Sequence, residues 1–369
     1  MPGIHILHVV GARPNLMKIA PLMVEITRHA DMEQTLLHTG QHYDARMSQV
    51  FFDELGIPKP DVYLGVGSDT HARQTANIMV GFEQVLQDHQ PDLVVVVGDV
   101  NSTLACAVTA SKLAVPLAHV EAGLRSWDRS MPEEINRIVT DALSDLLFTT
   151  SREANDNLIR EGIPPEKIHF VGNVMIDTLT QHLERARALC TPQKLGFSPG
   201  DYALLTLHRP SNVDQPDVFQ GILDALMVIQ QDLPILFPAH PRTRKQLKAF
   251  GFHDRLKVAK NIHIVEPLSY LEILDVMMHA RMVLTDSGGL QEETTILGIP
   301  CLTIRENTER PVTVSVGTNT LVGADPQRIV QETRLILQGK GRKGQVPELW
   351  DGRAAERIVE TIRTWAGLD

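Results

Sequence analysis

The stretch "DLVVVVGDVNSTLACAVTASKLAVPLAHVEAG", residues 92–123, holds the pattern that decides the fold. An apolar run ends in Gly98 and Asp99, an amphipathic segment covers residues 101–114, and a second apolar run begins at residue 116. Short apolar strands on either side of a helix are typical of a βαβ unit, in which both strands lie parallel in one sheet with helices on both faces. The stretch therefore predicts an α/β fold.

The same alternation continues toward both ends of the chain. Further strands are predicted in the first half at 4–10, 34–38, 146–150 and 168–172. After a Pro- and Gly-rich segment at 191–202, which predicts a linker, strands recur at 202–208, 234–240, 261–267, 281–286 and 300–306. We expect two Rossmann-like doubly wound domains, 1–188 and 189–350, and a C-terminal helix within 351–369 that packs back on the first domain.

Composition narrows the class of protein. The chain has 369 residues, 43% of them hydrophobic and 22% charged, which is enough apolar material for two soluble cores. A formal net charge of −10 argues against nucleic acid and anionic membranes as partners. We found no apolar stretch near the roughly 18 residues that a membrane span needs, and no signal peptide. We therefore expect a cytoplasmic protein.

Several cofactor fingerprints are absent from the sequence. No GxGxxG follows a strand and no GxxxxGK[ST] occurs, so neither a tightly bound NAD nor an ATPase site is supported. Three distant cysteines and 15 histidines form neither a CxxC pair nor an HExxH motif. We expect no cofactor and no metal.

Charged residues follow the predicted strands of the first half, at the sheet edge where such folds bind ligands. Arg13 and Lys18 flank a helix start after the first strand, an arrangement that suits a phosphate or carboxylate. Asp99, Glu121 and Glu133 come after the next strands, and together they could act as acid and base. Each also has a plainer interpretation: Asp99 as a helix cap, and Glu133 in a surface pair with Arg137.

The second half repeats this arrangement. His208 and Arg209 follow one strand, and His240 follows the next. The segment "TDSGGLQEE", residues 285–293, predicts a diphosphate cradle, because glycines at a helix N-terminus let backbone N–H groups approach an anion. A glutamate farther along that helix could bind ribose hydroxyls.

Taken together, these motifs resemble the non-hydrolysing UDP-N-acetylglucosamine 2-epimerases over essentially the whole chain. The resemblance rests on "GARPNLMK", "GQH", "GDVNST", "HVEAGLRSWD", "PEEINR", "HRPSN", "TDSGGLQEE", "TERP" and "DGRAAERIVE", in that order and spacing. It implies the GT-B architecture with an active site in the interdomain cleft, a UDP-sugar substrate and a homodimer.

The resemblance also implies roles for individual residues. It assigns catalysis to Asp99, Glu121, Glu133 and His208. It assigns substrate binding to Arg13, Lys18, Arg137, Leu268, Ile273, Ser287, Gly288, Gly289, Glu293 and Arg310. A regulatory second UDP-sugar site is a further possibility at Gln41, His42, Arg73, Arg209 and His240.

The implied reaction is reversible C2 epimerisation of UDP-N-acetylglucosamine to UDP-N-acetylmannosamine, through elimination of UDP and its re-addition to 2-acetamidoglucal. The product class points to cell-surface polysaccharide synthesis. Three alternatives remain at this point: the same epimerisation on a UDP-diacetamido-glucuronate sugar, a hydrolysing epimerase, and a GT-B glycosyltransferase. The first is compatible with "GARPN" and "HRPSN", where many family members read GTRPE and HRREN, because these substitutions leave room for a modified sugar.

Overall fold

The computed structural model describes residues 3–41, 52 and 54–368, and divides the chain into two compact units. Unit 1 comprises residues 1–181 and 348–369, and unit 2 comprises 182–347. The chain crosses from one unit to the other within helix α7 (Val174–Arg187) and again after residue 347. The domain limits expected from the sequence, 188 and 350, remain predictions, and the two compact units meet at 181/182 and 347/348 in the chain.

Unit 1 is built on a seven-stranded parallel sheet in the order β3-β2-β1-β4-β5-β6-β7. Its strands are β1 (Ile4–Val10), β2 (Met32–His38), β3 (Val62–Tyr63), β4 (Leu93–Val97), β5 (Leu117–Ala122), β6 (Leu146–Thr149) and β7 (Ile168–Phe170). Its other helices are α1 (Arg13–Ile26), α3 (His71–His89), α4 (Asn101–Lys112), α5 (Pro132–Leu143), α6 (Arg152–Arg160), η1 (Pro165–Lys167) and α17 (Ala354–Trp365).

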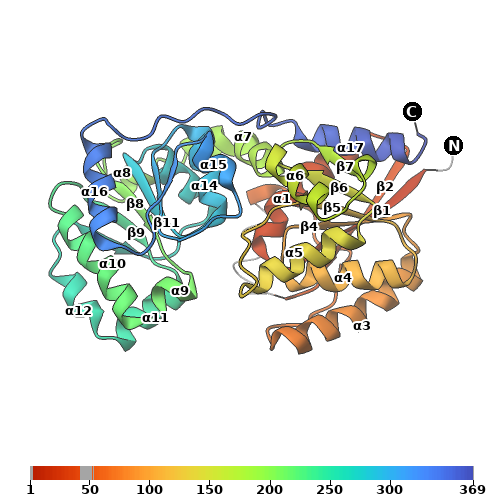
Figure 1. Cartoon of the computed structure of the whole chain (residues 1–369), viewed down its shortest axis with the longest axis horizontal. Helices are drawn as coiled ribbons and strands as arrows, with labels where there is room; N and C mark the ends of the chain where they lie inside the picture. The colour runs from red at the N-terminus through yellow and green to blue at the C-terminus, as the bar shows by residue number, and fades with distance from the viewer. Residues whose placement is uncertain (1–2, 42–51, 53, 369) are drawn as a thin grey trace. The chain divides into compact units, whose positions relative to one another are not determined.

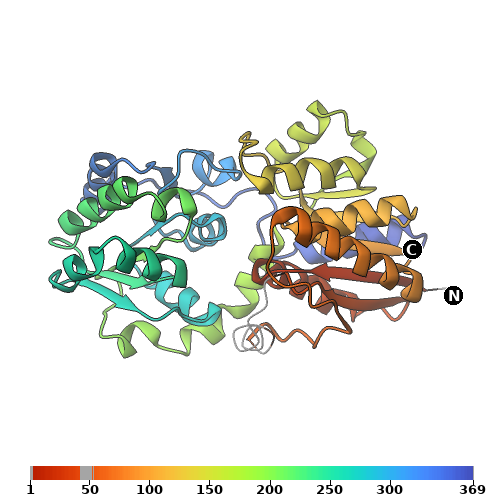
Figure 2. The same ribbon diagram turned by 90° about the horizontal axis from the view of Figure 1, so that it is seen from below.

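The sheet of unit 1 lies between two layers of helices (Figures 1 and 2). Helices α3, α4 and α5 pack side by side on one face, while α1 packs with α17 on the other. The α4 face is close-packed because the helix presents small side chains there, including Ala105, Cys106 and Ala110, all fully buried. The approach at the end of β1 is equally tight: a Cβ on Gly11 would lie 2.0 Å from Ser102 Oγ. Only glycine fits there.

The C-terminal helix α17 is held to unit 1 by buried hydrogen bonds. Asp177, on α7, accepts the backbone N–H groups of Ala354 and Ala355 at 3.2 and 2.8 Å, and so satisfies two donors at the start of α17. The Trp350 indole N–H donates to the carbonyl of Thr150 at 2.8 Å. The last helix is thus an integral part of the first unit, although more than 160 residues separate the segments it joins.

Unit 2 repeats the topology with six parallel strands in the order β10-β9-β8-β11-β12-β13. Its strands are β8 (Ala203–Thr206), β9 (Ile235–Pro238), β10 (Ile262–Val265), β11 (Met282–Thr285), β12 (Cys301–Thr303) and β13 (Asn319–Leu321). Its helices are α8 (Thr191–Lys194), α9 (Pro210–Val213), α10 (Pro216–Ile229), α11 (Pro241–Ala249), α12 (Phe252–Lys257), α13 (Tyr270–Met278), α14 (Gly288–Leu297), α15 (Pro311–Ser315) and α16 (Pro326–Leu337).

Every strand predicted from the sequence is present, and both sheets are doubly wound, which confirms the predicted α/β fold class. The two strands that the sequence pattern missed, β3 and β13, have two and three residues. Runs that short carry no readable alternation of apolar and polar residues. In the part of the chain that the structure describes, no helix is long and apolar enough to cross a membrane.

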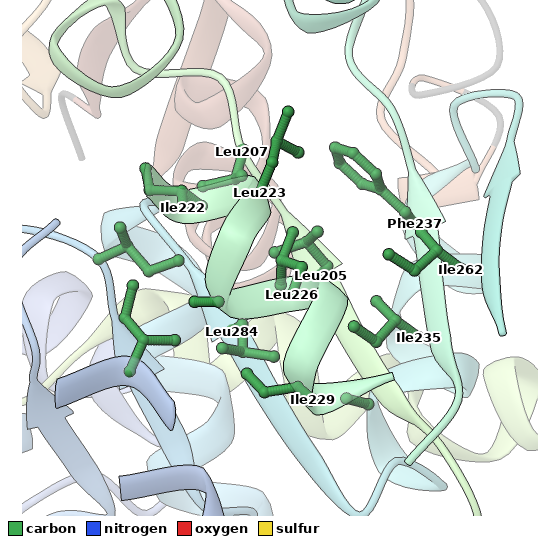
Figure 3. Close-up of a cluster of buried hydrophobic side chains, with 14 of the residues drawn as sticks. Leu205, Leu207, Ile222, Leu223, Leu226, Ile229, Ile235, Phe237, Ile262 and Leu284 are labelled. Carbon is green, nitrogen blue, oxygen red and sulfur yellow. The ribbon is translucent and has the colours of Figure 1, made fainter. Parts of the chain in front are cut away.

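The core of unit 2 lies between its sheet and helices α10 and α16. On α10, Ile222, Leu226 and Ile229 recur on one face and contact strand residues such as Leu205 and Ile235 (Figure 3). This spacing is that of an amphipathic helix lying on a sheet.

Leu226 is fully buried and Val228, two residues on, is 38% exposed on the same helix. We therefore expect Leu226→Ala to lower the free energy of unfolding by about 2–5 kcal/mol, since it leaves a cavity in the core. Val228→Ala, the matched control, should change it by no more than about 0.5 kcal/mol. Urea unfolding followed by circular dichroism measures both, and equal losses in the two variants would contradict the assigned packing.

Candidate functional site

Several of the predicted site residues follow the strands between which the strand order reverses in each sheet. In unit 1 the reversal falls between β1 and β4, and in unit 2 between β8 and β11. Open parallel sheets bind ligands at this point, beyond the carboxyl ends of the strands. Arg13 and Asp99 follow β1 and β4, and His208 and Ser287 follow β8 and β11. Each unit therefore carries its own set of site residues.

Unit 1 holds two carboxylates beside buried cations, Glu121 with Lys18 and Asp99 with Arg137, and we call these four residues the carboxylate cluster. Glu121, 4% exposed at the end of β5, forms an ion pair through Oε2 with the ammonium of Lys18, 6% exposed on α1. Burying both charges is tolerated because each compensates the other. A Cβ on Gly98 would lie 2.9 Å from Lys18 Nζ and 3.4 Å from Glu121 Oε2, so the chain after β4 closes against this pair.

Lys18 is directed to this point by the turn between β1 and α1. The side chain of Asn15 accepts the N–H groups of Gly11 and Ala12 at 3.1 and 2.9 Å. Its amide donates to the carbonyl of Val97 at 2.9 Å, which ties the start of α1 to the end of β4. Arg13, the first residue of α1, is half-buried beside this turn.

Asp99 and Arg137 form the second ion pair of the cluster. The guanidinium of Arg137, only 2% exposed, lies 3.5 Å from Asp99 Oδ2, and the neighbouring Asn136 donates to the Asp99 carbonyl at 2.8 Å. Asp99 does not cap α4, whose first turn is instead bound by Gln41. The Asp99 carboxylate keeps about 30% of its surface exposed. A partly exposed carboxylate beside a buried cation can reach a ligand.

The plainer alternative for Glu133, a surface pair with Arg137, is wrong. Arg137 is buried and binds Glu134 at 3.2 Å, because a spacing of three residues brings Glu134 onto the inward face of α5. Glu134, 1% exposed, also accepts the N–H groups of Ser126 and Trp127 at 3.0 and 2.8 Å, so it holds the preceding loop. Glu133 is half-buried and makes no ion pair within the described residues, which leaves its carboxylate available.

In unit 2 His208 is oriented by a buried carboxylate. Its ring Nδ1 lies 2.9 Å from Asp286 Oδ1, and Asp286 also accepts the backbone N–H groups of His208 and Arg209 at 2.9 and 2.8 Å. Burial alone raises the pKa of Asp286, but the His208 ring and these N–H groups outweigh it and hold the pKa below its usual value. Since Nδ1 is bound and the side chain is 41% exposed, Nε2 is the nitrogen left to meet a substrate.

The predicted phosphate cradle of unit 2 consists of Ser287, Gly288 and Gly289 at the start of α14, with Arg310. Ser287 is the N-cap residue, but its side chain makes no capping hydrogen bond. Arg310, 8% exposed, binds Glu292 on α14 at 2.7 Å and Glu309 at 2.5 Å. A Cβ on Gly288 would lie 2.8 Å from the Arg310 guanidinium, so the glycine is what admits this cation to the helix N-terminus.

Glu293 lies farther along α14 and is 2% exposed. Burial and the neighbouring Glu292 carboxylate raise the pKa of Glu293 to about 8, against the opposing effect of the Tyr270 hydroxyl. Glu293 Oε1 is buried and has no hydrogen-bond partner among the described residues. Leu268, before α13, and Ile273, on α13, are both half-buried.

The residues suggested for a regulatory site differ in how deeply they are buried. Gln41 is buried, and its side chain accepts from the N–H and hydroxyl of Ser102 at 2.9 and 2.6 Å. Arg73 is exposed near the start of α3, and Arg209 is 25% exposed and 3.9 Å from Glu309. His240, exposed, caps α11 and its ring lies 5.7 Å from that of His208. His42 lies outside the described residues. This site stays a prediction.

Three residues that shape the site were not singled out from the sequence: Asp286, Asn15 and Glu309. Asp286 carried a usable signal, since an acid directly after a buried strand at the reversal point often binds the facing loop. Asn15 carried none for its bond to the Val97 carbonyl, which belongs to a segment 82 residues away. Glu309 carried none because the residue types alone do not show which acid binds Arg310.

Glu293 offers a test through pH. A carboxyl whose pKa is higher in the folded than in the unfolded protein makes the folded protein less stable as pH rises through that interval. We expect the free energy of unfolding of the native protein to fall between about pH 4.5 and pH 8, relative to Glu293→Gln, by a few kcal/mol. Urea titrations at pH 5 and pH 8 measure it, and parallel pH profiles for the two proteins would contradict a neutral, buried Glu293.

Comparison with known proteins finds relatives that match nearly the whole chain. A family model described as UDP-N-acetylglucosamine 2-epimerase matches residues 24–363. The UDP-N-acetylglucosamine 2-epimerase of Methanocaldococcus jannaschii is 43% identical over 96% of this chain and 97% of its own length. A UDP-2,3-diacetamido-2,3-dideoxy-D-glucuronate 2-epimerase of Pseudomonas aeruginosa is 42% identical over 97% of this chain and 99% of its own.

Solved structures give the same result. The M. jannaschii enzyme in complex with UDP-GlcNAc and UDP is 42% identical and superposes with a TM-score of 0.91, covering 98% of this chain and 100% of that one. The enzyme of Neisseria meningitidis bound to UDP-GlcNAc is 30% identical, with a TM-score of 0.89 over 98% and 100% of the two chains. The chain belongs to the UDP-N-acetylglucosamine 2-epimerase family.

Proposed function

We propose that this protein interconverts UDP-N-acetylglucosamine and UDP-N-acetylmannosamine by inverting C2 without net hydrolysis. The observation that carries the proposal is the carboxylate cluster of unit 1, in which Glu121 and Asp99 end adjacent strands and each contacts a buried cation. Unit 2 adds an anion cradle and an oriented histidine. Membership of the epimerase family supports the assignment.

Inversion at C2 is explained by an elimination followed by a re-addition. C2–H of an N-acetyl sugar has no adjacent carbonyl, so removing its proton alone would leave an unstabilised carbanion. If the C2–H electrons form a C1–C2 double bond while the C1–O bond breaks toward UDP, the products are 2-acetamidoglucal and UDP. Re-addition of UDP at C1 and of a proton at the opposite face of C2 gives the epimer. Atoms and charge balance without an oxidant or a cofactor.

Two faces of one carbon need two proton carriers. We propose Glu121 and Glu133 for these roles, with Asp99 as a third participant or as the group that adjusts them. On the leaving-group side, the cradle residues and Arg310 suit the departing diphosphate, and His208 Nε2 can contact it. Arg13, Lys18 and Arg137 would add positive charge, Glu293 would bind ribose, and Leu268 and Ile273 would contact the uracil ring.

Two further statements rest on the family resemblance and remain proposals: that the protein is a homodimer and that it acts in the cytoplasm. Size-exclusion chromatography with light scattering decides the first.

A second sugar is favoured by one observation. The P. aeruginosa relative named for the diacetamido-glucuronate sugar is 42% identical, against 43% for the M. jannaschii relative. Such close values make UDP-2,3-diacetamido-2,3-dideoxy-glucuronate the alternative substrate of the same reaction.

The deciding experiment is proton NMR of the purified protein with UDP-N-acetylglucosamine in D2O. We expect UDP-N-acetylmannosamine to appear with deuterium at C2 and little free UDP. Stoichiometric free UDP with N-acetylmannosamine would assign hydrolysis instead, and no reaction with this sugar but reaction with the diacetamido sugar would assign the alternative.

Substitution of the proton carriers tests their roles. We expect Glu133→Gln to lower kcat by on the order of 100-fold or more, since an amide cannot exchange the proton. Glu121→Gln should do the same, though it also leaves Lys18 without its counter-charge. Glu184→Gln, a surface carboxylate 85% exposed, is the control and should keep full activity. Unchanged kcat in folded Glu133→Gln would remove that residue from the mechanism.

The cradle is tested by Gly288→Ala. The added Cβ would displace Arg310 and Glu309, so we expect UDP to bind at least about 10-fold more weakly by calorimetry. Gly81→Ala on α3 is the matched control, because its Cβ would meet only ordinary contacts, at 3.4 Å from Leu64. Equal UDP affinity in both variants would contradict the cradle.

A further inference from the structure

Glu121 holds an unusual backbone conformation. Its φ is +75°, in the left-handed region, which costs a side-chain-bearing residue about 1–2 kcal/mol. The pairing of β5 with β6 also shifts register between Val120 and Ala122, a bulge that turns the Glu121 side chain away from the regular strand direction. Strained residues of this kind persist only where the surroundings enforce them. Something next to Glu121 must therefore hold it.

On one side of Glu121 stands His119, which is fully buried. Its Nδ1 lies 2.6 Å from Asp141 Oδ1, and its Nε2 lies 2.9 Å from the carbonyl oxygen of Gly98. Each ring nitrogen therefore lies within hydrogen-bond distance of an oxygen atom. The His119 ring thereby connects Asp141 to Gly98, the residue that precedes Asp99.

On the other side of Glu121, Asp141 binds the chain again. Its Oδ2 accepts the backbone N–H of Gly123 at 3.1 Å and lies 2.7 Å from the guanidinium of Arg125. Arg125 is fixed in turn by Glu161, with contacts of 2.8 and 2.6 Å. Burial alone raises the pKa of Asp141, but the His119 and Arg125 cations outweigh it and lower the pKa. Asp141 is thus a buried carboxylate with cations on both oxygens.

We propose that Asp141 and His119 are positioning residues for the proton transfer assigned above, an inference that rests on the proposed function. Asp141 contacts the His119 side chain and accepts the backbone N–H of Gly123, so it holds the segment that contains Glu121 from both sides, an arrangement that we call the clamp. Through His119 it also fixes Gly98, whose backbone closes against the Lys18–Glu121 pair. We assign both residues to holding the backbone that aims Glu121.

The test is Asp141→Asn, which keeps the shape but replaces one acceptor oxygen by an N–H2 group facing donors. We expect kcat to fall on the order of 10- to 100-fold, because a small misplacement of a reacting group has effects of that size. KM for UDP-N-acetylglucosamine and the Kd of UDP should stay within about twofold, since substrate affinity is assigned mainly to unit 2. A merely structural role would not separate kcat from KM in this way.

Two variants of His119 test separately its contact with Asp141 and its contact with the Gly98 carbonyl. Glutamine places its amide nitrogen near the position of Nε2, and asparagine places it near that of Nδ1. His119→Gln therefore retains a donor for Gly98 and His119→Asn retains one for Asp141. We expect kcat to fall in both variants with little change in KM, because each variant loses one of the two contacts of the His119 ring.

Asp177→Asn is the matched control. Asp177 is a buried carboxylate of the same unit that also accepts two backbone N–H groups, but these belong to α17. We expect its kcat to stay within about twofold of the native value. If Asp177→Asn lost as much kcat as Asp141→Asn, the effect would be general destabilisation and the positioning role would be wrong.

The remaining outcomes separate this inference from the proposed function. An active native enzyme with unchanged kcat in folded Asp141→Asn and in both His119 variants would overturn the positioning role alone. An inactive native enzyme would overturn the proposed function instead. The clamp itself is then judged by the crystal structure of Asp141→Asn, or of His119→Gln if the first variant does not fold. A φ at Glu121 that becomes negative supports the clamp, and an unchanged positive φ overturns it.

Discussion

The buried ion pair between Lys18 and Glu121 is the contact on which the unit 1 site depends. A lysine and a glutamate can be 6% and 4% exposed only if each compensates the other, so α1 and β5 must meet where they do. The parallel sheet makes the meeting possible, because β1, β4 and β5 all end at one edge. Gly98 has no side chain, so the backbone after β4 can lie against the ion pair. Asn15 fixes the start of α1 to the end of β4 through its hydrogen bond to the Val97 carbonyl.

The same topology serves a different purpose in unit 2. There the strand ends carry His208 on Asp286 and the glycines of α14 beside Arg310. A protein with a net charge of −10 has no general attraction for an anionic ligand, so the positive charge has to be local. Glu292 and Glu309 hold the Arg310 guanidinium at the N-terminus of α14. The partial positive charge of the helix dipole there adds to the positive charge of the guanidinium.

Part of this candidate site was predictable from the sequence, and the errors have two causes. Asp99 and Glu121 could be placed together because residues after consecutive strands of a βαβ unit share an edge. The partner of Arg137 could not be predicted, since Glu133 and Glu134 both lie within reach on a helix and only burial of one face selects Glu134. The short strands β3 and β13 were missed because each pairs at an edge of its sheet and contributes almost no pattern of its own.

The sequence by itself determined the fold class, the order of strands and helices, the family, and the strand ends where the polar residues gather. These follow from local periodicity and from motifs whose residues are close together in the chain. Only the tertiary structure decided the left-handed conformation of Glu121, the contacts that His119 and Asp141 make on either side of it, and the raised pKa of the buried Glu293 carboxyl. Each of these depends on contacts between distant segments, because desolvation and ion pairing act through space and leave no trace in local sequence.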